Sequence, residues 1–194
     1  MTCIVGFTNG ETSWIGGDSF GSNGYSGQVY KNKKIFKLHD SSDIIAGYTT
    51  SFRMGQLLQY SEKLFDELSI LKNKIDEKYM INTFIPNLQK LFHDGGFLRN
   101  SNGEKFGGNF LIAIKETIFE VQNDYSVLIP KNNFCSVGCG EDFSNASLYS
   151  LRNEDLTPEE RITKALESAE HFSTGVKRPF HIINTDNDKI ITID

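Results

Sequence analysis

The order of strand and helix patterns along the chain is the feature that most limits its fold. The predicted order is four strands (2–48), two helices (50–93), about four strands (110–137), two helices (141–172) and two strands (180–193). Because strands follow strands without an intervening helix, the βαβ alternation of a doubly wound parallel sheet is absent. Two sheets with a pair of helices outside each would bury every apolar face, so the order predicts an α+β, four-layer αββα sandwich.

The first two strand patterns, residues 2–8 and 11–17, flank the dipeptide Asn9-Gly10, which favours a two-residue type I′ turn. A hairpin with that loop would set Thr2 opposite Gly17, with Asp18 one step further on. The sequence therefore predicts that the start of the chain lies close to a carboxylate.

The later segments carry more local signals. Apolar residues recur at helical spacing from about Thr50 to Leu71 and from about Lys78 to His93, where Pro86 either kinks the helix or marks a shifted start. The polar, glycine-rich segment Gly95–Gly108 predicts a mobile loop.

Residues Thr157, Pro158 and Glu160 predict the start of the last long helix. Thr157 suits the N-cap position, Pro158 suits the first helical position, and Glu160 would complete a capping box.

Composition and net charge limit which class of protein this chain can belong to. A chain of 194 residues with 38% hydrophobic content is expected to form a single globular domain, 1–194. No run approaches the roughly 18 to 20 apolar residues of a membrane helix, and no secretory signal is readable, so the default expectation is a cytoplasmic location. The net charge of −5 and the lack of a large basic cluster argue against nucleic acid or a membrane as partner.

The three cysteines, Cys3, Cys135 and Cys139, are too few for a disulfide framework, which agrees with a reducing compartment. Cys135 and Cys139 have no nearby histidine at the spacing of a zinc site. Neither a metal nor a cofactor is therefore expected.

Thr2 is the residue with the most distinctive chemistry. Methionine aminopeptidases remove Met1 readily when the next residue is small, and removal would give Thr2 a free α-amine beside its own hydroxyl. The reference pKa of an α-amine is about 7.7 to 8.0, so it can act as a base near neutral pH. Nucleophile and base would then belong to one residue.

Four short motifs, TCIV, IGGDS, KKIFKL and IIAGYT, occur in an order and at intervals that resemble the proteasome β-subunit and HslV family. The resemblance implies an αββα fold and an N-terminal threonine peptidase. It assigns Thr2 as nucleophile, Asp18 as the carboxylate that orients the N-terminal group, Lys34 as the charge that stabilises the alkoxide, and the Gly47 amide as oxyanion donor.

Three positions depart from the family pattern. Cys139 stands where the family has a serine, and His171 and Thr174 correspond to the family's aspartate and serine after the last long helix. The resemblance implies that all three support the site from a second layer. One residue also looks inserted between Leu38 and Gly47.

Family members work in rings, so the resemblance implies a homo-oligomer, a peptide or unfolded-protein substrate and an ATPase unfoldase as a further partner. Two other functions stay open. The chain could be a catalytically inactive assembly or binding protein, as it would be if Met1 were retained, or an amidase that acts on a small molecule. His39, His93 and His181 have no matched partner and are expected to be structural.

Overall fold

The computed structural model describes residues 1–38, 43–61, 64–65 and 75–194 of the chain. Much of the predicted helix Thr50–Leu71 lies outside these residues, and so does His39. Within them the helix is α1 (Phe52–Gln59), which Ser51 caps by accepting a hydrogen bond from the Arg53 amide. No helix in the described ranges has the length and apolar content needed to cross a membrane.

Two antiparallel sheets form the centre of the molecule. The first has the order β12 (Phe134–Gly138), β1 (Cys3–Thr8), β2 (Ser13–Gly17), β13 (Phe180–Asn184) and β14 (Ile191–Ile193). The second has the order β11 (Val127–Leu128), β10 (Thr117–Val121), β9 (Phe110–Ile114), β6 (Ile44–Tyr48) and β5 (Ile35–Lys37).

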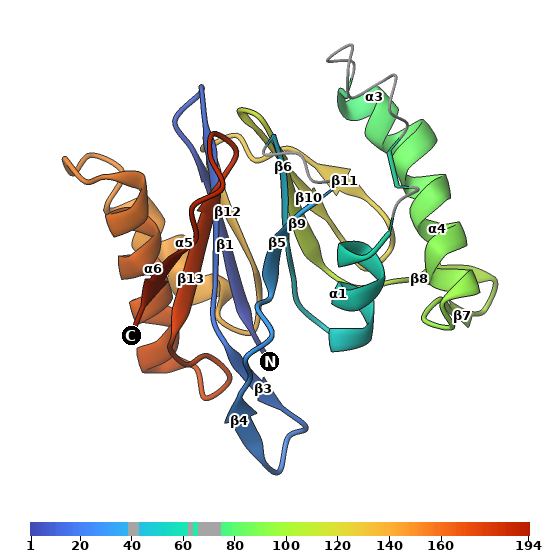
Figure 1. Cartoon of the computed structure of the whole chain (residues 1–194), viewed down its shortest axis with the longest axis horizontal. Coiled ribbons are helices and arrows are strands. Elements are labelled where there is room, and N and C mark those ends of the chain that lie inside the picture. The colour runs from blue at the N-terminus through green and yellow to red at the C-terminus, as the bar shows by residue number, and fades with distance from the viewer. Residues whose placement is uncertain (39–42, 62–63, 66–74) are drawn as a thin grey trace.

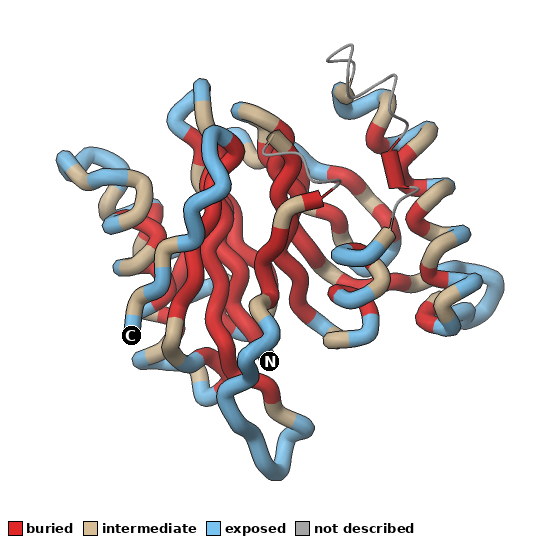
Figure 2. Tube along the Cα trace, in the orientation of Figure 1, coloured by how far each residue is buried: buried red, intermediate tan, exposed pale blue. Residues whose placement is uncertain are grey.

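The two sheets lie face to face, with helices on the outer side of each (Figure 1). A buried cluster that includes Ile4, Ile15, Leu111 and Ile118 joins the sheets. The strands of both are buried along most of their length, as Figure 2 shows. The predicted mixture of helices and antiparallel strands is confirmed.

Each helical layer buries one apolar face on its sheet. Helices α5 (Glu141–Ser150) and α6 (Pro158–Phe172) cover the first sheet through a cluster that contains Leu148, Ile162 and Leu166. The predicted capping box at the start of α6 is confirmed, since the Thr157 and Glu160 side chains each bond the other's backbone amide.

The second sheet is covered by α1 and by one helical run, 77–94. The run comprises α3 (Glu77–Tyr79), the π-helical turn η1 (Met80–Phe84) and α4 (Ile85–Asp94). Pro86 has no amide hydrogen for the usual bond four residues back, and the wider turn directly before it adapts the helix to this gap.

The predicted register of the first hairpin is wrong by two residues. Ile4 pairs with Gly17 and Thr8 with Ser13, which leaves a four-residue turn, 9–12. The Asn9 side chain explains the longer loop, because its Oδ1 accepts hydrogen bonds from the Glu11 and Thr12 amides at 2.9 and 2.8 Å. A shift of two residues keeps every side chain on its predicted face.

Two small hairpins were absent from the predicted order. Strands β3 (Phe20–Ser22) and β4 (Gly27–Val29) form a hairpin that projects from the end of the molecule near the N-terminus (Figure 1). Strands β7 (Arg99–Ser101) and β8 (Glu104–Phe106) pair within the segment predicted to be a loop. Strands β4, β7 and β8 are largely exposed, and β3 has only three residues, so neither hairpin shows the alternating apolar pattern that identifies a strand.

Candidate active site

Thr2, Asp18 and Lys34 meet at one end of the two sheets. Thr2 directly precedes β1, Asp18 directly follows β2, and Lys34 directly precedes β5. All three are buried, with exposed fractions of 5%, 0% and 2%. The pairing of β1 with β2 therefore sets the distance between the first two residues, and the β5 strand brings in the third.

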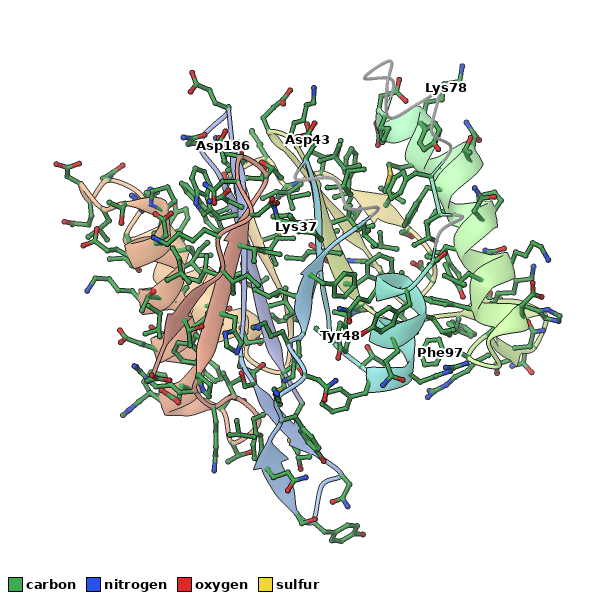
Figure 3. All side chains as sticks on the ribbon, in the orientation of Figure 1. Lys37, Asp43, Tyr48, Lys78, Phe97 and Asp186 are labelled. Carbon is green, nitrogen blue, oxygen red and sulfur yellow. The ribbon has the colours of Figure 1, made fainter. Side chains whose placement is uncertain are left out.

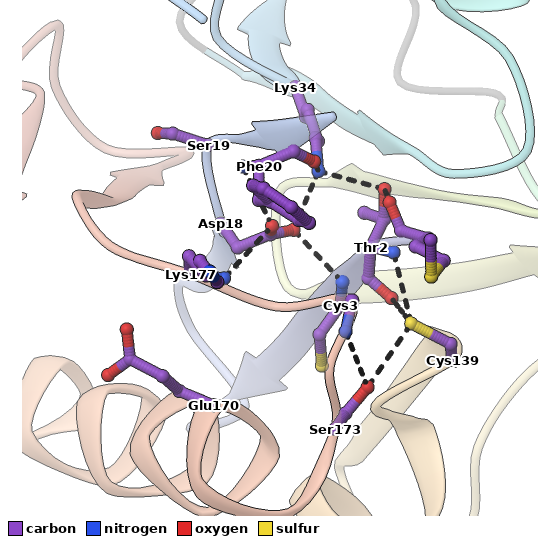
Figure 4. A network of polar contacts seen from close by, with 12 residues as sticks. Thr2, Cys3, Asp18, Ser19, Phe20, Lys34, Cys139, Glu170, Ser173 and Lys177 are labelled. Atoms are coloured by element: carbon purple, nitrogen blue, oxygen red, sulfur yellow. Dashed lines mark hydrogen bonds and ion pairs between the residues drawn. The ribbon is translucent and has the colours of Figure 1, made fainter. Parts of the chain in front are cut away.

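Lys34 is the centre of this group (Figure 4). Its Nζ donates hydrogen bonds to Thr2 Oγ1 and Asp18 Oδ1, each at 2.9 Å, and to the Phe20 carbonyl oxygen at 2.5 Å. An ammonium group has three protons, and each has an acceptor here. Lys34 is thus fixed in one orientation, with its charge directed at the Thr2 hydroxyl.

The Asp18 carboxylate is held as firmly as the lysine. Its Oδ1 also accepts the Cys3 amide at 3.0 Å, and its Oδ2 accepts the amides of Phe20 at 3.0 Å and Lys177 at 3.5 Å. Three chain segments therefore converge on one side chain.

Burial acts on both members of the Asp18–Lys34 ion pair. It raises the pKa of the Asp18 carboxyl, because a charge is costly away from water, and the Lys34 charge and the backbone amides oppose this rise. Burial likewise lowers the pKa of Lys34, and Asp18 opposes that shift. The pair therefore supports a buried positive charge beside Thr2, and burial makes that charge easier to remove at high pH than on an exposed lysine.

The backbone nitrogen of Thr2 faces a different set of groups. It donates to Cys139 Sγ at 3.2 Å, and this sulfur lies 3.4 Å from the Thr2 carbonyl oxygen and 3.4 Å from Ser173 Oγ (Figure 4). With Met1 attached the nitrogen belongs to a peptide bond, and the Thr2 hydroxyl donates to the Met1 carbonyl oxygen. Removal of Met1 would turn this nitrogen into an amine next to the thiol.

Gly47, expected to supply the oxyanion donor, lies inside β6 between its partners Ile35 and Leu111. A Cβ atom at this glycine would come within 2.6 Å of the Ile4 side chain. Gly47 is therefore packed in the core between the sheets and is not among the residues that line the pocket at Thr2.

Thr50, unlike Gly47, is in the lining of the pocket at Thr2. It has a φ of 62°, in the left-handed region that is uncommon for threonine. The amides on either side of it make hydrogen bonds: the Thr49 amide donates to the Asn109 carbonyl oxygen, and the Ser51 amide donates to the Thr49 carbonyl oxygen. For the Thr50 amide, the described residues offer no hydrogen-bond acceptor. The sequence carries no glycine at this position to signal the unusual conformation.

His171 and Thr174 do not join the group around Thr2. Both are exposed, and the His171 ring packs edge-on against Phe172 with centroids 4.6 Å apart. Ser173, between them, makes the contact with Cys139. Among the described residues after α6, the contact with Cys139 thus comes from the residue directly before Thr174.

A small pocket opens beside Thr2, and we call it the Thr2 pocket. Its volume is about 100 Å³. Its lining includes Met1, Thr2, Lys34, the segment 48–52 from the end of β6 to the start of α1, and Gly21 and Ser22 of β3. A ligand carbonyl placed here could meet the Thr2 hydroxyl and the Lys34 charge, with Thr50 in the same lining.

No protein-family model matches this chain, and no curated protein sequence matches it. Solved structures do. HslV from Trypanosoma brucei has a TM-score of 0.67 at 17% identity, over 94% of this chain and 98% of its own. BPH from Thiobacillus denitrificans, solved in complex with epoxomicin, has a TM-score of 0.70 at 14% identity, over 99% of each chain.

Anbu from Hyphomicrobium sp. strain MC1, solved as a Gly-1 mutant, has a TM-score of 0.70 at 13% identity, over 100% of this chain and 87% of its own. At identities this low the likeness concerns the fold. The resemblance expected from the sequence is confirmed at that level: this chain has the fold of the proteasome-like N-terminal nucleophile hydrolases HslV, BPH and Anbu.

Proposed function

We propose that this protein is an N-terminal threonine hydrolase that cleaves amide bonds through an acyl-enzyme on Thr2, after removal of Met1. The observation that carries the proposal is the position of the Lys34 ammonium, 2.9 Å from both Thr2 Oγ1 and Asp18 Oδ1 in a buried site. A buried ion pair costs desolvation energy, and one that points at a hydroxyl is typical of a functional site.

The first half of the reaction forms an ester on Thr2. The α-amine takes the proton from the Thr2 hydroxyl, and Oγ1 attacks the carbonyl carbon of the substrate amide. The Lys34 charge stabilises the oxygen as it loses its proton and also favours the neutral form of the amine. The resulting oxyanion would accept a hydrogen bond from the Thr50 amide, in place of Gly47.

The second half releases the products. The tetrahedral intermediate collapses, the C–N bond breaks, and the leaving nitrogen takes the proton that the α-amine holds. Water then attacks the ester and gives its proton to the same amine. A carboxylic acid leaves, and Thr2 Oγ1 recovers a proton.

A peptidase is favoured within this class, because the similar folds include BPH bound to epoxomicin and HslV. On the same ground we propose one four-layer αββα domain that assembles into a homo-oligomer. A ring, an ATPase unfoldase that delivers substrate and a cytoplasmic location stay predictions.

To test this proposal, the purified protein is treated with a peptide epoxyketone that targets N-terminal threonine. The product is then analysed by intact mass measurement and peptide mapping. We expect the protein to lack Met1 and to carry one label on Thr2. The variant Thr2→Ala should take no label, whereas Thr12→Ala, the same change in the first hairpin turn, should be labelled like the parent.

Two results would favour the other functions. A protein that keeps Met1 in its native host would be a binding or assembly protein, because its Thr2 nitrogen is not basic. Turnover of small amides without cleavage of any peptide would indicate a small-molecule amidase.

A further inference from the structure

A second hollow lies directly behind the Thr2 pocket. This hairpin hollow has a volume of about 470 Å³ and extends under the β3–β4 hairpin, with Tyr30 and Gln28 among its lining residues. Three residues, Gly21, Ser22 and Phe52, line both the hollow and the Thr2 pocket. Phe52 is the only large side chain of the three, so its ring separates the two spaces.

The Phe52 ring is held from two sides. It meets the Tyr30 ring edge-to-face at 5.1 Å and the Tyr48 ring edge-to-face at 6.2 Å. Tyr48 is the last residue of β6, and its side chain packs against Gly55 of α1 (Figure 3). The backbone of Phe52 is fixed at the start of α1, directly after the cap residue Ser51. A Cβ atom at Gly21 would come within 2.4 Å of Tyr30 and 2.8 Å of Phe52. The rings therefore close tightly over β3.

The chemistry of the proposed reaction decides which part of a substrate enters the Thr2 pocket. The leaving nitrogen must lie near the α-amine, because it takes its proton from that group. The amine faces Cys139, whose thiol contacts Ser173, and neither residue lines the Thr2 pocket. The leaving group therefore points toward Cys139, and the side chain on the acyl side of the scissile bond points into the Thr2 pocket.

We propose that Phe52 acts as a partition that limits the acyl-side residue to a small side chain without positive charge; this inference rests on the proposed function. With Met1 still in its lining, the Thr2 pocket has a volume of about 100 Å³, against about 470 Å³ for the hairpin hollow. Removal of Met1 opens the pocket on the Met1 side and leaves the Phe52 ring in place, so the space beside that ring suits a small side chain such as alanine, serine, threonine or valine. The Lys34 ammonium in the lining disfavours a cationic side chain. Without the Phe52 ring, the pocket would continue into the hairpin hollow and accept a large side chain.

The test compares two peptide epoxyketones that differ only in the residue next to the reactive group, alanine in one and phenylalanine in the other. The rate of Thr2 labelling is followed by intact mass. The parent protein should react at least about tenfold faster with the alanine probe, and Phe52→Ala should reduce or reverse this preference. Phe143→Ala, the same change at an exposed ring on α5, is the matched control and should keep the parent's preference.

The outcomes separate this inference from the proposed function. Equal labelling of the parent by both probes, or a preference that Phe52→Ala leaves unchanged, would overturn the partition and leave the threonine hydrolase intact. A protein that lacks Met1 and takes neither probe would overturn the hydrolase and the partition with it. Phe52→Leu guards against misfolding, because it keeps most of the apolar packing and should give an intermediate preference.

Discussion

The two sides of Thr2 are built differently. On the hydroxyl side, Lys34 and Asp18 are buried, charged and fully hydrogen-bonded, and they come from the first 34 residues of the chain. On the amine side, Cys139 is exposed, and its contacts with Thr2 and Ser173 run through a sulfur atom at 3.2 to 3.4 Å.

A thiol is a weak hydrogen-bond donor and acceptor, whereas an ammonium–carboxylate pair in a dry site interacts strongly. For the proposed reaction, this difference predicts that the hydroxyl side sets the reactivity of Thr2 and that the amine side adjusts it.

Removal of Lys34 is expected to have the largest effect, and it tests whether the hydroxyl side controls Thr2. Lys34→Ala should reduce the rate of Thr2 labelling by about 10³-fold, because the developing alkoxide loses its charge partner. It should also lower the free energy of unfolding by about 3–5 kcal/mol, because Asp18 is left buried and unpaired. Lys37→Ala, at the end of β5, removes an ion pair with the exposed Asp188 and should change neither quantity much.

The double variant Asp18→Asn with Lys34→Met separates stability from reactivity. It removes both charges and should recover much of the lost stability without recovering the labelling rate. A double variant that labels like the parent would show that the hydroxyl side does not control Thr2.

Substitution of Gly47 tests whether this glycine serves the core or the oxyanion. Gly47→Ala should lower the free energy of unfolding by about 1–3 kcal/mol in a chemical denaturation experiment, because the new methyl group meets the Ile4 and Ile15 side chains. Thr50→Gly should instead gain up to about 1 kcal/mol, since its φ of 62° suits glycine, and should keep its labelling rate because the amide remains. A stable Gly47→Ala protein would contradict the close packing at β6.

The pH dependence of labelling should assign one limb to each side of Thr2. The rate should rise as the pH passes through the pKa of the α-amine, at or below about 8, because only the neutral amine is a base. As the pH rises further, the rate should fall, and this fall should begin before pH 10.5, the ordinary pKa of a lysine. The reason is that burial lowers the pKa of Lys34, so its charge is lost at a lower pH than on an exposed lysine. Labelling rates measured from pH 5 to 10.5 would show this, and a rate that stays level up to pH 10.5 would argue against a role for the Lys34 charge.

The smallest effect is expected for Cys139→Ser. A hydroxyl bonds the amine more strongly than a thiol does, so the acid limb of the pH profile should shift while the maximum rate changes by less than about tenfold. The control is Ser136→Ala, which removes a buried hydroxyl on the preceding strand, β12, and should leave the acid limb of the pH profile unchanged. A 10³-fold loss of labelling rate in Cys139→Ser would show that the amine side affects Thr2 as strongly as the hydroxyl side does.

The part of the fold that the sequence predicts well is the part with strong patterns. The strands of both sheets and the start of α6 at Thr157 combine periodic apolar residues with specific turn or capping residues. The β3–β4 and β7–β8 hairpins have neither, because β4, β7 and β8 mostly face water and β3 is only three residues long. The register of the first hairpin failed for another reason, since the Asn9 side chain stabilises a longer turn that competes with the two-residue one.

The same distinction holds for the candidate site. Thr2, Asp18 and Lys34 are adjacent to strands, so the pairing of β1 with β2 and the packing of the second sheet, which contains β5, on the first bring them together. Thr50 and Ser173 lie in irregular segments, where a one-residue difference in loop path changes which group faces Thr2. Positions of that kind follow from backbone conformation, as the φ of Thr50 illustrates, and short motifs do not encode it.

The bond between the Thr2 hydroxyl and the Met1 carbonyl has a consequence for timing. While Met1 is attached, the nitrogen lone pair is shared with that carbonyl and the hydroxyl is engaged by it, yet Asp18 and Lys34 already stand in place. If the proposed function is correct, folding and activation are separate events: the newly made chain is an inert precursor with a finished site, and the enzyme that trims its first residue decides when hydrolysis can begin.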